Sequence, residues 1–273
     1  MGYAVLWSGG KDSCFAYYKA MLQGYHIRCL VILVKKGNRL SLSHFRKDKI
    51  IQSQAEALGV FLLQKEIIRY NIPPIQYRIS SIFGSQGKLS RYARNIIRNV
   101  FFQLRAVLRK TTKTSVAILM HSVIGKYNKQ FQKIVRSLAL DGIEGIISGD
   151  FEPTGQKEFF DRICKKEGVE LITPLCEQDR EKTVRDFINA GFEAIVVVVN
   201  LSFLGKEHLG RKVDKEFLDF LAKNNIDLSG ENGEYHTLVT DGPIFKKRIE
   251  IIKSKTVTVG IDAYLDILKY SLI

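Results

Sequence analysis

The most informative gap in this sequence is the lack of acidic residues over a long central stretch. Residues 67–140 contain no Asp or Glu, although the whole chain has 28 of them. The same stretch holds fourteen of the 42 Lys and Arg residues, a number equal to the formal net charge of +14. The basicity therefore belongs to one segment, and the rest of the chain is balanced in charge.

Paired cysteines and long apolar runs are also missing. The four cysteines, Cys14, Cys29, Cys164 and Cys176, form no C-x-x-C pair, which argues against a zinc site, a disulfide framework and persulfide-based sulfur transfer. No apolar run approaches the roughly 20 residues of a membrane-spanning helix, and the first residues show no secretory signal pattern. We therefore expect a cytoplasmic protein with reduced thiols.

The first motif in the sequence is a glycine-rich turn between a strand and a helix. Residues 3–7 predict a buried strand, and residues 14–23 have helical spacing that ends at Gly24. Between them lies Ser8-Gly9-Gly10-Lys11-Asp12-Ser13. In this strand–loop–helix order, backbone N–H groups can donate hydrogen bonds to a phosphate. The glycines let the backbone lie close to the phosphate and adopt positive φ angles. The common P-loop pattern G-x-x-x-x-G-K-[ST] is absent.

Further apolar strands alternate with helices on both sides of the basic segment. Strands are predicted at residues 27–34, 60–68, 143–148, 169–174 and 192–199, and helices at residues 47–58, 129–140, 156–167 and 181–189. This alternation indicates an α/β fold with a doubly wound, mostly parallel, Rossmann-like sheet, which binds ligands at the carboxyl ends of its strands. We expect a nucleotide-binding domain over residues 1–175, with a basic insertion at about 67–126, and a smaller C-terminal α/β domain over residues 176–273 for the substrate or acceptor.

The basic segment contains a predicted amphipathic helix over residues 90–110. At about 100° per residue, one face gathers arginines and the other face is apolar; the arginines are Arg91, Arg94, Arg98, Arg105 and Arg109. Three interpretations stay open for this face: solvent exposure on a helix packed against the body, binding of RNA or another acidic macromolecule through residues 67–140, and binding to a membrane surface.

Two polar blocks lie in the C-terminal third. Leu209-Gly210-Arg211 precedes a predicted helix over residues 214–223. Residues 230–237 read Gly-Glu-Asn-Gly-Glu-Tyr-His-Thr and lead into an apolar run. Taken alone, this second block is a solvated turn before a strand, but its density of Glu, Asn, His and Thr exceeds what a chain reversal needs.

These blocks occur in an order that resembles a known family. The hexapeptide at residues 8–13 resembles the PP-loop of ATP pyrophosphatases, which split ATP between its α- and β-phosphates. With Gln-Ala-Glu-Ala-Leu-Gly at residues 54–59, Ser148-Gly149-Asp150 and the two C-terminal blocks, it resembles the diphthine–ammonia ligase family. The resemblance implies an ATP-dependent carbon–nitrogen ligase. ATP would adenylate the carboxylate of diphthine, a modified histidine on elongation factor 2, pyrophosphate would leave, and ammonia would displace AMP.

The resemblance also implies cofactors and residue roles. ATP and Mg²⁺ would be the cofactors, with Asp12 positioning the magnesium ion. The nucleotide would be held by Ser8, Gly9, Gly10, Lys11, Asp12, Ser13, Gly149 and Asp150. The acceptor side would be lined by Arg211, Glu231, Asn232, Glu234 and His236. Lys11 and Asp12 would serve catalysis at the phosphates, and Glu234 or His236 would take a proton from ammonium or ammonia.

Two departures from the family pattern bear on the acceptor. The last block reads Glu234-Tyr235-His236-Thr237, where the eukaryotic and archaeal pattern has Glu-[Phe/Tyr]-Glu-Thr, and the histidine form looks like bacterial relatives. The basic insertion has no counterpart in the compact family pattern. Two alternatives therefore stand beside the ligase: a PP-loop RNA-modifying enzyme that docks tRNA through the basic segment, and a non-catalytic protein that binds nucleotide or nucleic acid.

Overall fold

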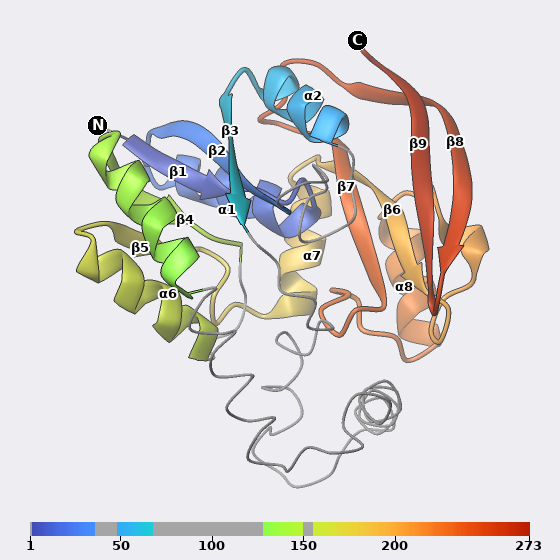
Figure 1. The fold of residues 1–273 in the computed structure, drawn as a ribbon. Coiled ribbons are helices and arrows are strands. Elements are labelled where there is room, and N and C mark those ends of the chain that lie inside the picture. The colour runs from blue at the N-terminus through green and yellow to red at the C-terminus, as the bar shows by residue number, and fades with distance from the viewer. Residues whose placement is uncertain (1, 36–47, 68–127, 150–154) are drawn as a thin grey trace, which may run out of the picture.

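Two β-sheets form the framework of the protein (Figure 1). The computed structural model describes residues 2–35, 48–67, 128–149 and 155–273. A five-stranded parallel sheet has the order β3-β2-β1-β4-β5 and contains β1 (Gly2–Leu6), β2 (Ile27–Lys35), β3 (Phe61–Ile67), β4 (Ile143–Ile147) and β5 (Glu170–Ile172). A four-stranded antiparallel sheet has the order β7-β6-β9-β8 and contains β6 (Glu193–Asn200), β7 (Tyr235–Asp241), β8 (Ile249–Val259) and β9 (Asp262–Leu272). The predicted fold class is confirmed.

Helices connect and cover these strands. They are α1 (Lys11–Leu22), α2 (Asp48–Leu58), the helical residues 128–140, α6 (Gly155–Lys166), α7 (Arg180–Asn189), the short 3-10 helix η1 (Lys206–His208) and α8 (Lys215–Lys223). None of the helices in these ranges is long and apolar enough to cross a membrane. The predicted basic helix at residues 90–110 lies outside the described residues. The domain division after residue 175 stays a prediction.

The strand order of the parallel sheet fixes where a ligand binds. β1 pairs with β2 on one side and with β4 on the other, so the direction of winding reverses between β1 and β4. In open α/β sheets, ligands bind in the crevice at the carboxyl ends of the strands at this reversal. The loop at residues 8–13 follows β1, and Ser148 and Gly149 follow β4. The predicted loop and Gly149 therefore lie at the reversal.

Two hydrophobic clusters cover the parallel sheet. In the smaller cluster, side chains of β1 and β2 pack against residues 128–140 and α6; it includes Ala4, Cys29, Val31, Phe131, Leu138 and Phe160. The larger cluster contains side chains of α1, α2 and α7 and continues onto the antiparallel sheet. Since one cluster contains side chains of both sheets, packing fixes the position of β7 relative to the loop after β1.

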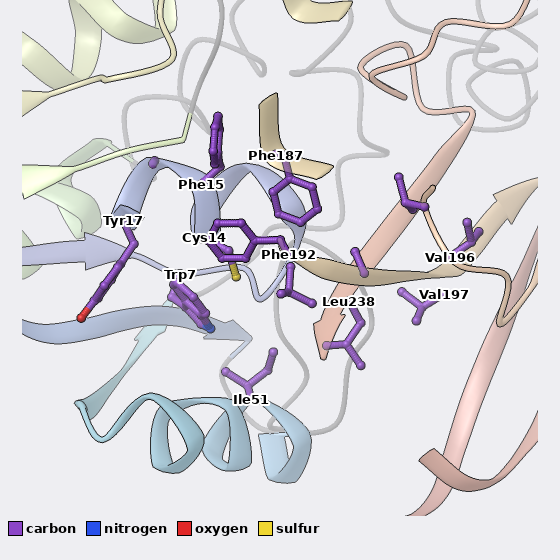
Figure 2. Close-up of a cluster of buried hydrophobic side chains, with 14 of the residues drawn as sticks. Trp7, Cys14, Phe15, Tyr17, Ile51, Phe187, Phe192, Val196, Val197 and Leu238 are labelled. Atoms are coloured by element: carbon purple, nitrogen blue, oxygen red, sulfur yellow. The ribbon is translucent and has the colours of Figure 1, made fainter. Parts of the chain in front are cut away.

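Aromatic rings make up the centre of the larger cluster (Figure 2). Phe187 of α7 stacks on Phe192 with ring centroids 4.8 Å apart, and Phe15 of α1 meets both rings edge-on. Leu238 of β7 and Ile51 of α2 belong to the same cluster. Full burial of one such side chain stabilises the fold by about 1.5–3 kcal/mol, so this cluster is a strong constraint on how the two sheets meet.

Candidate functional site

The loop after β1 is a tight turn held by two serine hydroxyls. Ser8 and Ser13 share a hydrogen bond between their Oγ atoms at 3.0 Å, and the Gly10 N–H donates to Ser8 Oγ. Gly9 takes a positive φ of 74°, as the sequence predicts, but Gly10 has φ −88°. The requirement at Gly10 is for space, because a Cβ there would lie 3.3 Å from the Thr237 carbonyl oxygen.

Strand β7 lies against this loop along its free edge. The Lys11 N–H, at the start of α1, donates to Thr237 Oγ1 at 3.0 Å, and the Val239 N–H donates to the Gly9 carbonyl at 3.0 Å. Gly10 supplies no side-chain cap for α1, so Thr237 serves as a cap from a distant part of the chain. β7 is an edge strand of its sheet, and the loop pairs with backbone groups that the edge would otherwise expose.

Gln54 of α2 bridges the loop and β7. Its side chain is fully buried, its Nε2 donates to the carbonyls of Gly9 at 3.0 Å and Val239 at 2.8 Å, and its Oε1 accepts from Trp7 Nε1 at 3.1 Å. The sequence places Gln54 in a family-like segment but assigns it no role. A buried amide whose donors and acceptor are engaged in this way fixes the position of the loop.

An ion-pair cluster joins the loop to the polar block at residues 230–237. Lys11 is only 5% exposed, its Nζ donates to both carboxylate oxygens of Asp12 at 2.7 and 2.9 Å, and Nζ lies 3.8 Å from Glu231 Oε1. Burial, the largest single influence, lowers the pKa of Lys11, but Asp12 and Glu231 outweigh it and the net pKa is raised. Lys11 therefore stays a cation at this site.

Glu231 titrates close to neutral pH. Burial and the neighbouring Asp12 raise its pKa to about 7, although Lys11 and Arg180 act in the opposite direction. About 29% of the Glu231 side chain stays exposed, so solvent screens these interactions in part. Arg180 is the first residue of α7, and its influence on Glu231 places the start of that helix beside the cluster.

Asp227 organises the turn that carries Glu231, and the sequence analysis missed it. Its carboxylate accepts hydrogen bonds from the Ser229 N–H at 2.8 Å, from Ser229 Oγ at 2.7 Å and from Asn232 Nδ2 at 2.8 Å. The Tyr235 hydroxyl donates to the Leu228 carbonyl and closes the turn. An Asp two residues before Ser is typical of such self-bonded turns, so a local signal was available.

Glu234 is buried at the start of β7. Its side chain is 3% exposed, and burial raises the pKa of its carboxyl group, although hydrogen bonds from its own main chain and from Asn232 act against the rise. Oε2 has no hydrogen-bond partner among the described residues. The predicted acceptor residues Asn232 and Glu234 therefore lie together, and Asn232 also contacts Asp227.

Gly149 packs directly on the first turn of α1. A Cβ at this position would lie 2.8 Å from the Asp12 carbonyl carbon and oxygen and 2.9 Å from the Ser13 nitrogen. The segment after β4 therefore contacts the loop, as expected for two neighbours at the reversal of the sheet. The predicted nucleotide-binding residue Asp150 lies outside the described residues.

We expect Gly149→Ala to displace the loop. The added methyl group meets backbone atoms of Asp12 and Ser13, so the free energy of unfolding should fall by about 1–3 kcal/mol. The ATP-dependent turnover that the family resemblance implies should fall by about 100-fold if the loop moves by about 1 Å. Urea unfolding and AMP formation measure the two effects. Gly205→Ala is the control, because the three atoms nearest its added Cβ belong to the exposed Glu207 carboxylate, which can move away; equal behaviour of the two variants would contradict the proposed contact.

Arg211 packs on aromatic rings of α8, and His236 lies in β7 next to Thr237. The Arg211 guanidinium stacks over the rings of Phe217 and Phe220 in α8, at 5.2 and 5.6 Å. No ion pair in the described part of the chain joins Arg211 to Glu231. His236 is half-buried in β7 opposite Val198. Their predicted roles in acceptor binding and proton transfer stay predictions.

A cavity of about 500 Å³ lies next to the turn that begins at Asp227. It lies between the start of α7 and the end of α8 and shares Asp227 with the turn at residues 227–232; the lining residues are Asp179, Arg180, Glu181, Ala222, Ile226, Asp227 and Leu228. Arg180, which lines the cavity, lowers the pKa of Glu231 through its positive charge. Its size suits a small substrate or a side chain of a larger one.

Known proteins match most of this chain. A solved structure, "predicted subunit of tRNA methyltransferase" from Methanocaldococcus jannaschii, is 15% identical with a TM-score of 0.42 over 89% of this chain and 98% of its own, a likeness too weak to support an argument. The diphthine–ammonia ligase of Rattus norvegicus is 25% identical and that of Homo sapiens 24%, each over 97% of this chain and 88% of the relative.

Family models match both parts of the candidate site. The model of the diphthamide synthase N-terminal domain matches residues 1–70, and that of the C-terminal domain matches residues 179–273. The first segment contains the loop at residues 8–13 and Gln54, and the second contains the turn at residues 227–232 and β7. Because the two matches cover more than half of the sequence and include the segments that meet in the site, the chain belongs to the diphthamide synthase family.

Proposed function

We propose that this protein is an ATP-dependent ligase that adenylates a carboxylate, releases pyrophosphate and then lets ammonia displace AMP to form an amide. The observation that carries the proposal is the Lys11–Asp12–Glu231 cluster, in which a phosphate-type loop meets the C-terminal polar block. Relatives in this family are named diphthine–ammonia ligases. Diphthine on a translation factor is therefore the first acceptor to test.

The loop supports binding of ATP phosphates. The N–H groups in the first turn of α1 lie at the positive end of the helix dipole, where they favour a bound anion. Lys11 adds a buried positive charge at the same point. Charge that develops on a leaving pyrophosphate would be stabilised by these preorganised groups. The hydroxyls of Ser8 and Ser13 hold the shape of the turn.

Asp12 fits a role in holding magnesium. Its carboxylate oxygens are hard ligands of the kind Mg²⁺ prefers, and 31% of the side chain is exposed at the cluster. The described residues contain no group of three His, Cys, Asp or Glu side chains that could hold a metal alone. That agrees with the usual magnesium site, in which one or two carboxylates act with substrate phosphates and water. When bound, the ion neutralises phosphate charge.

The cavity beside Glu231 supports entry of the acceptor. Arg180 lines it, and a guanidinium can bind a carboxylate in two parallel hydrogen bonds. The acceptor carboxylate would then approach the α-phosphate from the side of Glu231. Glu234 and His236, both at β7, are the proposed proton acceptors on the nitrogen side.

The RNA-modifying alternative has no such support. The names of the curated relatives do not point to RNA as a substrate, and residues 68–127, which carry most of the basic segment, lie outside the described residues. The non-catalytic alternative makes a clear prediction of its own, since such a protein would bind ATP without forming AMP. It is therefore an outcome of the experiment below.

Product analysis by mass spectrometry tests the proposal. The purified protein is incubated with ATP, Mg²⁺, ammonium chloride and elongation factor 2 that carries diphthine, and Asp12→Ala is the control. AMP, pyrophosphate and conversion of the carboxylate to an amide are the expected products, and the control should form none of them. AMP without the amide would exclude diphthine as the amide acceptor, and the absence of AMP would exclude a ligase that acts on diphthine.

A further inference from the structure

Glu234 presents a buried carboxylate oxygen without a hydrogen-bond donor in the described part of the chain. The side chain is 3% exposed, its hydrogen bonds come from Asn232 and its own main chain, and Oε2 receives none. Buried polar atoms in folded proteins are nearly always paired, because an unpaired one costs its full desolvation. Such an atom calls for an explanation, and a donor that arrives with a ligand is one that fits a candidate site.

The surroundings of Glu234 favour a cation. Four carboxylates, those of Asp12, Asp227, Glu231 and Glu234, act on Tyr235, which neighbours Glu234 in the chain. Lys11 and Arg180 act on Glu231 with positive charge. Within this set of described residues four carboxylates face two cations, so a small positive ligand would reduce the repulsion between the carboxylates.

We propose that Glu234 Oε2 binds the nitrogen substrate as an ammonium ion and removes its first proton. The inference rests on the proposed ligase function and specifies the form in which nitrogen enters. Ammonium is small, positive and rich in N–H donors, so it matches an unpaired acceptor among carboxylates.

The proposed step balances in protons and electrons. One N–H bond of ammonium breaks, the proton moves to Glu234 Oε2, and the electron pair becomes the lone pair of ammonia. That pair attacks the acyl carbon of the adenylate and forms the C–N bond, while the bond from carbon to the phosphate oxygen breaks and AMP leaves with its electrons. A second proton leaves the new amide nitrogen for solvent, and Glu234 then releases its proton to solvent as well. Burial raises the pKa of the Glu234 carboxyl group, which makes its carboxylate a stronger base.

Glu234→Gln should separate formation of the acyl-adenylate from formation of the amide. The test measures acceptor-dependent exchange of labelled pyrophosphate into ATP without ammonium, and amide formation at increasing ammonium chloride concentrations, with diphthine-bearing elongation factor 2 as the acceptor. Exchange should stay within about threefold of the wild type, and kcat/KM for ammonium should fall by about 100-fold or more. Glu216→Gln, at an exposed position of α8, should change neither. Hydroxylamine, a neutral nucleophile that needs no prior deprotonation, should restore much of the amide-forming rate in the variant.

Three results have distinct meanings. Unchanged use of ammonium by Glu234→Gln would overturn the ammonium role, as would loss of exchange and amide formation together. No exchange in the wild type would instead overturn the ligase function. A measurement on the wild type alone decides the matter if the variant does not fold. KM for total ammonium should stay constant as pH rises toward the pKa of ammonium, whereas binding of neutral ammonia would lower KM by about tenfold per pH unit.

Discussion

Lys11→Ala should lower ATP-dependent AMP formation by about 10²–10³-fold, the usual effect of removing one preorganised charge-stabilising donor. Lys11 is buried, and its ammonium contacts Asp12 and Glu231 at the start of α1. The raised pKa of Lys11 keeps this charge in place at any pH at which the enzyme would be assayed. No other residue of the loop carries a positive charge, so a neighbouring side chain of the loop cannot replace it.

The same substitution should change the protonation of Glu231. Lys11 lowers the pKa of Glu231, so its loss should move that pKa above about 7. Glu231 would then be protonated over part of the neutral range, which reduces the repulsion between it and Asp12. We therefore expect the free energy of unfolding to fall by only about 1–3 kcal/mol, less than for a fully buried pair, because both carboxylates are partly exposed.

Chromatographic measurement of AMP and pyrophosphate checks this prediction. Lys19→Ala is the matched control, because Lys19 lies on the same helix with its Nζ over the Phe15 ring, 5.1 Å from the centroid. The control should keep turnover within about threefold of the wild type, as expected for a surface change. Wild-type turnover in Lys11→Ala would show that the loop does not hold the phosphates, and the nucleotide site would have to be sought elsewhere.

Local signals predicted most of the parallel sheet. Its strands are short apolar runs, and its helices end at glycines such as Gly24 and Gly59, so the hydrophobic period and the helix stops agree. α1 begins at Lys11, three residues before the expected start. The difference arises because Lys11 joins the helix with a cap from Thr237, a contact that spans 226 residues and that no local pattern reveals.

The antiparallel sheet was harder to predict. The run at residues 192–199 indicates a buried strand, but hydrophobicity carries no information about strand direction, and β6 pairs antiparallel with β7 and β9. The hairpin of β8 and β9 was missed. Most of β8 is exposed and reads as alternating Lys, Thr and Val near the sheet edge, so its hydrophobic signal is weak.

The sequence predicted which segments form the candidate site but not how they are arranged in space. It singled out the loop at residues 8–13 and the block at residues 230–237, and in the structure Lys11 and Glu231 join these two segments. Asp227 and Gln54 were missed because their importance lies in hydrogen bonds to segments distant in sequence or to their own turn. Gln54 has no motif, since any amide in the right place can serve, whereas the Asp-x-Ser spacing at residues 227–229 is a local turn signal that was overlooked.

Gln54→Leu should destabilise the protein and misplace the loop. The substitution keeps the approximate size of the buried side chain but removes its three hydrogen bonds, so the Trp7 indole N–H and the Val239 carbonyl lose this partner inside the protein. Each buried group left unpaired costs about 1–3 kcal/mol, and we expect a loss of about 2–5 kcal/mol in the free energy of unfolding. Urea unfolding, monitored by Trp7 fluorescence, measures the change directly.

Comparison with Gln52→Leu separates the bridge from the general effect of the substitution. Gln52 lies on the same helix at an exposed position, so its change should shift the free energy of unfolding by at most about 0.5 kcal/mol. AMP formation, measured far below the unfolding temperature, should fall by about 10- to 100-fold in Gln54→Leu alone. If Gln54→Leu lost stability but kept full turnover, the hydrogen bond from the Val239 N–H to the Gly9 carbonyl would suffice to hold the loop. If it lost neither, the amide bridge would not contribute, and the shared hydrophobic cluster alone would set the distance between the loop and β7.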